Sequence, residues 1–401
     1  MTDWTTRLIH PDTRPPEGFR SLVPPVHRGS TVVFSSTAEV SDDWHHKDGY
    51  TYGLYGTPTA RDLAGRIAAL EGGHYTFITP GGQAAIALIS FAFTRAGDHA
   101  LIPDSAYGPT RQFADDVLAR FGVEVETYAP GLGGEIEGRM RANTRLVWCE
   151  SPGSATMEVQ DVPAIARAAH RHGAVVALDN TYAAGVYFDA FAHGVDVTMQ
   201  ALTKYVGGHS DLLLGSVTAR TEAEYEALGL MHARLGLGAS PDDCSLALRG
   251  MQTLGVRLAA LERGTLQVAR WLARHPAVET VLHPALPSCP GHALWQRDFT
   301  GSTSVFSIVL AAPATRGQVA AFVDGLRWFE IGYSWGGVTS LAVPFFDLHR
   351  THGPAYDGRL VRLNVGLEHP DDLVADLDQA FRAAGLPASP APLAGASDGS
   401  G

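Results

Sequence analysis

Residues 195–211 form the stretch Val195-Asp196-Val197-Thr198-Met199-Gln200-Ala201-Leu202-Thr203-Lys204-Tyr205-Val206-Gly207-Gly208-His209-Ser210-Asp211. Its first five residues predict a buried strand, and Lys204 follows that strand shortly before a glycine pair. Burial is costly for a lysine, because the ammonium loses its hydration and its pKa falls. A lysine in this place can form an imine with a carbonyl compound. It can also be a loop lysine whose tip reaches solvent, so the rest of the chain has to decide between the two.

The chain around this stretch alternates short apolar runs with helical patterns. Such alternation predicts an α/β fold with a large, mostly parallel sheet that is covered by helices on both faces. One helix is expected to begin at Thr57-Pro58 and to end at Gly72-Gly73. Further predicted helices are Gln83–Thr94, Thr110–Arg120 and Val162–His172. The predicted strands are Tyr75–Thr79, His99–Pro103, Val123–Tyr128, Leu146–Glu150, Val175–Asp179, Val195–Met199 and Leu212–Thr218.

A second, smaller α/β layer is predicted for the C-terminal part of the chain. It begins with a long helical region at Asp243–His275. We therefore predict an N-terminal arm (1–56), a large domain (57–245), a smaller C-terminal domain (246–386) and a disordered tail (387–401). The remaining predicted elements are the strands Glu279–His283, Ser304–Leu310 and Arg359–Val365 and the helices Gly317–Leu326 and Pro370–Ala384.

Composition excludes several classes of protein. The 401 residues carry a net charge of −12 without a basic stripe, so neither nucleic acid nor an anionic membrane is expected as a partner. Three cysteines, Cys149, Cys244 and Cys289, are too widely spaced for a disulfide framework or a clustered metal site. No histidine pair has a further ligand at metal spacing, so no metal is expected. Because signal-peptide features and long apolar runs are absent, we predict a cytoplasmic protein.

Polar residues follow the predicted strands at their carboxyl ends, the edge at which open α/β sheets bind ligands. Gly81-Gly82-Gln83 opens a helix, whose free N–H groups suit a phosphate, or it makes only a tight turn. Tyr107 offers a ring for stacking and a phenol for proton transfer, or it packs in a loop. Asp179 ends a buried strand, where it needs a cation or a donor unless it caps a following helix.

Arg362 lies in the middle of the last predicted strand. Strict alternation places Arg362 and Asn364 on one face of that strand and Val361, Leu363 and Val365 on the other. An arginine in mid-strand suits the bidentate binding of a carboxylate, although a structural salt bridge would explain it as well.

A phosphate site, a stacking tyrosine, a buried aspartate and an imine-forming lysine together describe a site for pyridoxal phosphate. The aspartate would keep the pyridine nitrogen protonated, so that the ring can withdraw electrons. Other enzyme classes have less support. The glycine pattern of dinucleotide-binding proteins and the Gly-x-Ser-x-Gly elbow of serine hydrolases are both absent from the sequence.

From about Thr5 to Ala384 the chain resembles the Cys/Met-metabolism family of pyridoxal phosphate enzymes, and within it most closely the bacterial cystathionine β-lyases. The resemblance implies fold type I, a homotetramer built as a dimer of dimers, and active sites at the dimer interface. It also implies α,β-elimination from an L-amino acid thioether, a small-molecule substrate, which gives a thiol, pyruvate and ammonia. The matching stretches include Gly56-Thr57-Pro58-Thr59, Glu150-Ser151-Pro152-Gly153-Ser154, Asp179-Asn180-Thr181, Thr203-Lys204-Tyr205, Gly208-His209-Ser210-Asp211 and Tyr333-Ser334-Trp335-Gly336-Gly337.

The resemblance also assigns roles to single residues. Lys204 would hold the cofactor as an imine and then move the Cα proton of the substrate. Asp179 would pair with the pyridine nitrogen, and Tyr107 would stack on the ring and help to deprotonate the incoming amine. The other implied residues are Gly82, Gln83, Thr203 and a neighbouring subunit's Tyr52 for the phosphate, and Arg362 (for the α-carboxylate), Ser334, Trp335 and Tyr55 for the substrate.

Two residues favour the β-lyase branch of the family. Pro109 stands where γ-lyases that release methanethiol tend to carry cysteine, and Trp335 stands where γ-enzymes usually carry leucine. On these two residues we expect β-elimination.

Several departures from the family pattern leave alternatives open. Leu54 and Tyr55 stand where the family often has arginine, and Thr339 stands where it nearly always has glutamate. Gln112 replaces an acidic residue that β-lyases can carry, and Ala201 replaces a common phosphate-binding serine. One alternative is a γ-elimination or γ-replacement enzyme of specialised metabolism with a substrate other than cystathionine. Another is a binding or regulatory relative without turnover, against which the intact implied site argues.

Overall fold

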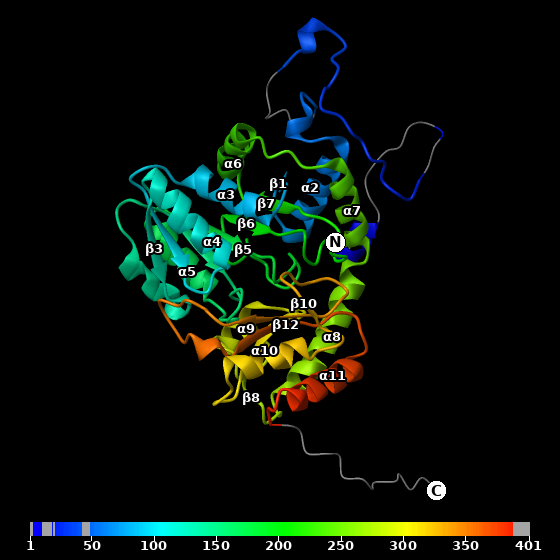
Figure 1. Ribbon diagram of the computed structural model, residues 1–401. Coiled ribbons are helices and arrows are strands. Elements are labelled where there is room, and N and C mark those ends of the chain that lie inside the picture. Colours follow the sequence, from blue (N-terminus) through cyan, green and yellow to red (C-terminus); the bar gives the residue numbers. More distant parts are fainter. Residues whose placement is uncertain (1–2, 10–17, 19–20, 42–48, 388–401) are drawn as a thin grey trace.

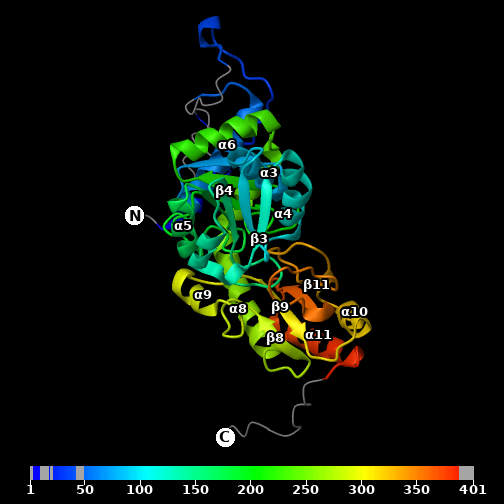
Figure 2. The ribbon, with the colours of Figure 1, turned by 90° about the vertical axis from the view of Figure 1, so that its left-hand side faces the viewer.

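Two β-sheets, one beyond the other along the long axis, form the framework of the molecule (Figures 1 and 2). The computed structural model describes residues 3–9, 18, 21–41 and 49–387. Part of the predicted N-terminal arm and all of the predicted disordered tail except Pro387 therefore lie outside the described residues. Within these ranges, no helix combines the length and the apolar character that a membrane span requires.

The larger sheet has seven strands in the order β1-β7-β6-β5-β4-β2-β3. β7 runs antiparallel to both of its neighbours, and all other pairings in this sheet are parallel. The prediction of an α/β fold with a mostly parallel sheet is confirmed. The strands are β1 (Tyr75–Thr79), β2 (His99–Pro103), β3 (Glu124–Tyr128), β4 (Thr144–Glu150), β5 (Val175–Asp179), β6 (Val197–Gln200) and β7 (Gly215–Ala219).

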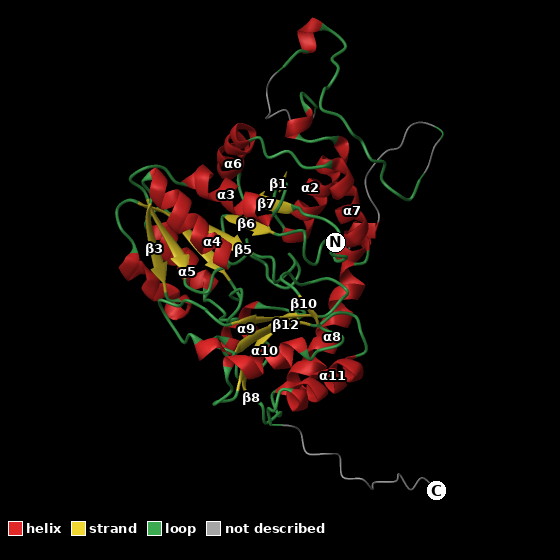
Figure 3. Ribbon diagram, in the orientation of Figure 1, coloured by secondary structure: helices red, strands yellow, loops and turns green. Residues whose placement is uncertain are grey.

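Helices cover both faces of the larger sheet (Figure 3). In β4, Val147 and Cys149 belong to the core shared with α5, whereas Leu146 and Trp148 belong to the core shared with α3 and α6. Successive side chains of a strand point to opposite faces, so a strand covered on both faces is apolar throughout. The helices of this part are α1 (Trp4–Ile9), α2 (Pro58–Glu71), α3 (Gly82–Phe93), α4 (Gly108–Phe113), α5 (Val162–Arg171), α6 (Glu222–Leu235) and α7 (Pro241–Gln252).

The smaller sheet has five strands in the order β10-β11-β12-β9-β8, and it is antiparallel except between β10 and β11. α8 (Leu254–Leu272) runs from the end of α7 to this sheet, as Figure 1 shows. Residues of α8, α10 and α11 share one apolar core with the strands. The other elements are β8 (Val278–Leu282), α9 (His292–Asp298), β9 (Val305–Leu310), α10 (Arg316–Asp324), β10 (Glu330–Ile331), β11 (Leu341–Phe345), β12 (Leu360–Asn364) and α11 (Pro370–Ala383).

The structure corrects several predicted elements. The predicted helix Thr110–Arg120 is not one α-helix: α4 ends at Phe113 and continues as a π-turn and a 3-10 turn as far as Phe121. The predicted long helix from Asp243 breaks at Thr253, whose φ and ψ of −107° and 3° separate α7 from α8. Five helices and strands were not predicted at all, namely α1, α6, α9, β10 and β11. The boundaries proposed for the two domains stay a prediction.

Two predicted helix ends are confirmed. The Thr57 side chain accepts a hydrogen bond from the N–H of Ala60 and so caps α2, with Pro58 in the first turn. At the other end, Gly72 adopts a left-handed conformation with φ of 76°, which a glycine adopts without strain. The helix is thereby held between these residues, and the following chain enters β1.

Candidate active site

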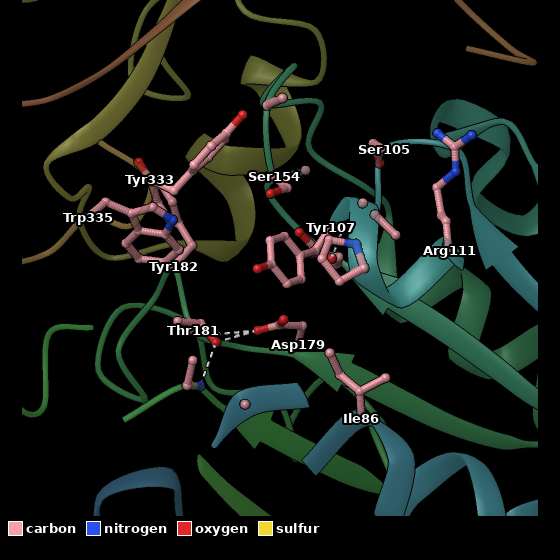
Figure 4. A pocket seen from close by; sticks show the side chains of 18 of the residues that line it. Ile86, Ser105, Tyr107, Arg111, Ser154, Asp179, Thr181, Tyr182, Tyr333 and Trp335 are labelled. Carbon is pink, nitrogen blue, oxygen red and sulfur yellow. Dashed lines mark hydrogen bonds between the residues drawn. The ribbon is translucent and has the colours of Figure 1, made fainter. Parts of the chain in front are cut away.

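A cavity of about 1000 Å³ lies between the carboxyl ends of the parallel strands and the smaller sheet. Its walls come from the ends of β2, β4 and β5, the start of α3, the turn after β6, and residues of β11 and β12. Figure 4 shows that Tyr107, Asp179, Ser154 and Trp335 converge on this space from different elements. The sheet edge at which ligand binding was predicted is therefore the edge that lines the cavity.

Lys204 lies in a turn four residues after the last residue of β6 and lines the cavity. Its Nζ donates a hydrogen bond to Ser334 Oγ at 2.8 Å and lies 5.6 Å from the centre of a Trp335 ring. Burial, and then the nearby Arg362 guanidinium, lower the pKa of Lys204 to about 8, although Asp179 opposes the shift. The Lys204 side chain is half-buried and its tip points into the cavity, and the amine is partly neutral near physiological pH.

Ser334 is held in an unusual backbone conformation. Its φ of 91° is one that residues other than glycine rarely adopt. Asn364 supports the loop that follows: its Oδ1 accepts from the N–H of Gly336, and its Nδ2 donates to the carbonyl of Thr339. Strain of this kind persists only where the surroundings enforce it, and here it directs the Ser334 hydroxyl toward Lys204.

Asp179 is the last residue of β5 and faces the cavity. Its Oδ1 accepts hydrogen bonds from the N–H and the hydroxyl of Thr181, and the Thr181 hydroxyl in turn accepts from the N–H of Ala201 (Figure 4). Burial raises the pKa of Asp179, while these hydrogen bonds and Lys204 favour its charged form. No helix begins after Asp179, so the alternative of a helix cap is wrong.

The start of α3 meets the turn that carries Lys204. α3 begins at Gly82, and a Cβ at this position would lie only 2.9 Å from the Cβ of Ala201. The first N–H groups of a helix have no partner within the helix, so Gly82 and Gln83 present donors to the cavity. Thr203 lines the same corner, and its hydroxyl is held by the backbone of Leu214.

Tyr107 and Glu150 are coupled across the cavity wall. Tyr107 directly precedes α4, and the ring lies over Asp179 in Figure 4. The N–H of Tyr107 donates to Glu150 Oε2 at 2.8 Å, and Glu150 is the direct neighbour of Asp179 in the β4–β5 pairing. Burial and then the charge of Asp179 hold the pKa of Glu150 well above its usual value. The sequence interpretation missed Glu150, although it ends a strand at the same edge as Asp179.

Arg362 is buried in the middle of β12 and lines the cavity. Its Nη1 reaches the carbonyl of Ser154 only at 3.5 Å, and its guanidinium lies 5.5 Å from the centre of the Phe345 ring. Burial lowers the pKa of Arg362 to about 10. In the described part of the chain no carboxylate forms a salt bridge with Arg362, so the alternative of a structural ion pair is wrong. A buried guanidinium of this kind suits a carboxylate ligand.

Tyr52 and Tyr55, the two other predicted site residues, do not line the cavity of their own chain. Both lie at the end of the arm, shortly before α2, and their rings contact each other edge to face with a centroid separation of 6.3 Å. The cavity thus gathers nine of the eleven predicted residues: Lys204, Asp179, Tyr107, Gly82, Gln83, Thr203, Arg362, Ser334 and Trp335.

Comparison with known proteins gives one consistent family. The sequence model of a family described as Cys/Met metabolism PLP-dependent enzyme matches residues 5–382. A relative from Rhizobium johnstonii is 47% identical over 383 residues, which cover 94% of this chain and 96% of the relative. The cystathionine beta-lyase MetC of Escherichia coli is 40% identical over 365 residues, covering 89% of this chain and 92% of that protein.

A solved structure gives the same fold. The crystal structure of metB from Corynebacterium glutamicum superimposes with a TM-score of 0.88 at 28% sequence identity. The match covers 95% of this chain and 98% of that one.

Proposed function

The chain belongs to the Cys/Met metabolism family of PLP-dependent enzymes, and from that premise we propose that it is a β-lyase. It would catalyse the α,β-elimination of an L-cysteine thioether such as cystathionine. The Cα–H and Cβ–S bonds break, and one water molecule is consumed as the remaining fragment becomes pyruvate and ammonia. The sulfur leaves as a thiol, so the reaction needs no oxidant or reductant.

The cavity residues fit pyridoxal phosphate. Gly82 leaves room where a Cβ would strike Ala201, and the first N–H groups of α3 suit a phosphate there. Asp179 is a half-buried carboxylate without an arginine or lysine salt bridge among the described residues, as a partner of a protonated ring nitrogen requires. When bound, the cofactor withdraws electrons from the substrate Cα through its protonated ring. Lys204 is the only lysine among the residues that the structure describes, and it would attach the cofactor.

The remaining steps belong to side chains of the cavity. Arg362 would bind the α-carboxylate of the substrate, because it is a buried cation without a carboxylate partner in the described chain. Lys204, with its pKa lowered to about 8, would take the Cα proton and pass a proton to the departing sulfur. Ser334 Oγ, which accepts from Lys204 Nζ, would orient that amine. Tyr107 would deprotonate the incoming substrate amine.

The observation that carries the proposal is the placement of a lysine with a lowered pKa and a buried arginine in one cavity with Asp179. The test is to load the purified protein with pyridoxal phosphate and to supply L-cystathionine, L-cysteine and further L-cysteine thioethers. We expect pyruvate in a one-to-one ratio with thiol, and no pyruvate from Lys204→Ala. If no thioether gives pyruvate, the β-lyase proposal is wrong.

A γ-elimination or γ-replacement enzyme is the second candidate. The departures from the family pattern around the substrate site favour it. Thr339, which stands where the family nearly always has glutamate, is exposed, and its carbonyl accepts a hydrogen bond from Asn364. This enzyme would release 2-oxobutyrate or a γ-substituted amino acid. Assaying both oxo acids in the same reaction separates the candidates.

We also propose a homotetrameric, cytoplasmic enzyme whose sites are shared between subunits. The arm supports this proposal, because residues 21–41 extend away from the body of the molecule at the end opposite the smaller sheet (Figures 1 and 2). Several of its apolar side chains are exposed, with Leu22 at 92% and Val33 at 90%. Exposed apolar side chains gathered on an extended segment suit contact with a second copy. Tyr52 lies near the end of the arm and would reach the partner's phosphate site.

A further inference from the structure

Glu150 is a buried titratable group to which the proposed reaction gives no role. It ends β4, lines the cavity and is only 7% exposed. Its Oε2 accepts a hydrogen bond from the N–H of Tyr107 at 2.8 Å, and no described residue donates to its Oε1. Buried polar atoms ordinarily have partners, so a carboxyl in this state beside the cofactor end of the cavity needs an explanation.

A buried chain of hydrogen bonds fixes the end of β4. The N–H of Glu150 donates to Gln160 Oε1 at 2.9 Å, and Gln160 Nε2 donates to Tyr128 Oη at 2.9 Å. Tyr128 Oη donates in turn to the carbonyl of Trp148 at 2.7 Å, two residues before Glu150. Gln160, Tyr128 and Trp148 are each 1% exposed. A satisfied buried network is rigid, so Glu150 offers Tyr107 a fixed point of attachment.

The Tyr107 side chain has no such support of its own. It is 41% exposed, and within the described ranges neither a hydrogen bond nor a ring contact holds it. The carbonyl of Tyr107 accepts from the N–H groups of Thr110 and Arg111, which belong to the six-residue helix α4. The direction of the ring therefore depends on the Tyr107 backbone, whose N–H is held by Glu150.

Two carboxyls lie side by side at this place. Glu150 and Asp179 are direct partners in the β4–β5 pairing, and both line the cavity. When two carboxyls share a site, one of them keeps its proton. Asp179 Oδ1 accepts two hydrogen bonds from Thr181, which favour its charged form, whereas Glu150 accepts only one. Burial and then the charge of Asp179 raise the pKa of Glu150 well above its usual value, while the Tyr107 N–H and the Arg362 guanidinium oppose the shift.

We propose that Glu150 is a positioning residue, which holds Tyr107 against the cofactor as a neutral carboxylic acid. A neutral acid still provides an acceptor for the N–H of Tyr107. It also leaves the negative charge to Asp179, which would pair with the protonated ring nitrogen. The inference rests on the role proposed for Tyr107 beside the cofactor, and it adds the residue that fixes this ring.

Binding of pyridoxal phosphate to Glu150 variants tests the inference without any substrate. Glu150→Gln keeps a neutral side chain with an acceptor, so the dissociation constant of the cofactor should stay within about twofold of the parent value. Glu150→Leu leaves the N–H of Tyr107 without its acceptor. We expect the dissociation constant to rise by about tenfold, together with a weaker circular dichroism band of the bound cofactor. Equal losses in both variants, or no loss in Glu150→Leu, would overturn the inference.

A double variant asks whether Glu150 acts through Tyr107. In a Tyr107→Ala background the ring is gone, so adding Glu150→Leu should change the dissociation constant by less than about twofold. If the two losses multiply instead, Glu150 acts independently of the ring and the inference is wrong. These measurements need no product, so a protein that binds the cofactor but gives no pyruvate refutes the β-lyase proposal alone.

Infrared spectroscopy of the holoenzyme tests the neutral form of Glu150 directly. The difference spectrum between the parent and Glu150→Gln at pH 7 should contain the C=O band of a protonated carboxylic acid. Glu135→Gln, at an exposed glutamate, is the matched control and should remove a carboxylate band. A carboxylate band in the Glu150 difference spectrum would overturn the inference.

Discussion

Lys204 is a destabilising residue in the chain without cofactor, because its ammonium is partly buried. The fold lowers its pKa from 10.5 to about 8, so the unfolded chain holds the proton more tightly than the folded one. The cost is therefore present in full below about pH 8 and is relieved as the pH rises toward 10.5. We expect Lys204→Met to raise the free energy of unfolding of the cofactor-free protein by about 2 kcal/mol at pH 7, after allowance for partial exposure.

Urea unfolding of the cofactor-free protein at pH 7 and pH 9.5 measures this effect. The gain from Lys204→Met should shrink clearly at the higher pH. Lys47→Met, at the chain's other lysine, is the control. A gain that is equal at both pH values, or absent at both, would show that the burial of the ammonium is not the cause.

Asp179 is expected to matter for the cofactor more than for the fold. Asp179→Asn keeps the size of the side chain and an oxygen for Thr181, but it removes the charge that would keep the ring nitrogen protonated. We expect pyruvate formation to fall by about 100-fold or more, together with a change in the visible spectrum of the bound cofactor. Asp116→Asn, on the exposed face after α4, is the control. If the visible spectrum of the bound cofactor and the rate of pyruvate formation both stay unchanged, Asp179 does not contact the ring nitrogen.

The sequence predicted individual site residues correctly where they directly follow the end of a predicted strand. Asp179 and Tyr107 both follow apolar strands that the sequence pattern locates, and their side chains enter the cavity. Glu150 also lies at the carboxyl end of a strand, but it was missed because it was assigned to the strand itself and not to the residues that follow it. The strained loop at Ser334 and its support by Asn364 depend on contacts between segments far apart in the sequence, which no local pattern contains.

At the scale of elements, the loop after β11 is held to the larger sheet by Arg350. Arg350 and Asp104 form a buried ion pair with an N–O distance of 2.6 Å, and both side chains are at most 2% exposed. Removing one partner of such a pair leaves an uncompensated buried charge. We expect Arg350→Met to lower the free energy of unfolding by about 3–5 kcal/mol.

The double variant Asp104→Asn/Arg350→Met tests the reason for that loss. It removes both charges, so it should be more stable than Arg350→Met alone when urea unfolding is compared. A double variant that is no more stable than the single one would mean that lost packing, and not the unpaired charge, explains the result.

The elements that the sequence predicted and those that it missed differ in physical character. The strands of the larger sheet were found because burial on both faces makes them continuous apolar runs. β10 has two residues and β11 contains Pro344, so neither has a strand pattern of its own, and tertiary pairing creates them. α6 was missed despite a visible signal, since Thr221 and Glu224 form a capping box at its start.

At the scale of the whole molecule, we predict that one chain completes the site of another. Tyr52 is 49% exposed and does not line its own cavity, whereas Lys204 does. Lys204→Ala and Tyr52→Ala should each be poorly active alone. When the two variants are unfolded, mixed and refolded together, random pairing should restore about a quarter of the sites, because half of the dimers then carry one intact site.

Pyruvate formation by the mixture, compared with each variant refolded separately, reads out this complementation. A mixture of Lys204→Ala and Asp179→Asn is the control. Both residues line the cavity of one chain, so this mixture should restore no sites. Restored activity in the control mixture would contradict the prediction that Tyr52 of a second subunit completes each site. A lack of restored activity in the Tyr52 mixture would contradict it as well.

The most direct measurement concerns the attachment of the cofactor. The full sequence contains two lysines, Lys47 and Lys204, so a covalent imine can form on only two side chains. Borohydride reduction of the holoenzyme makes the link permanent, and digestion with mass spectrometry then locates it. We expect the modified peptide to carry Lys204, with one cofactor per chain and with Lys47 unmodified. Modification of Lys47 instead, or of neither lysine in a protein that holds the cofactor, would contradict it.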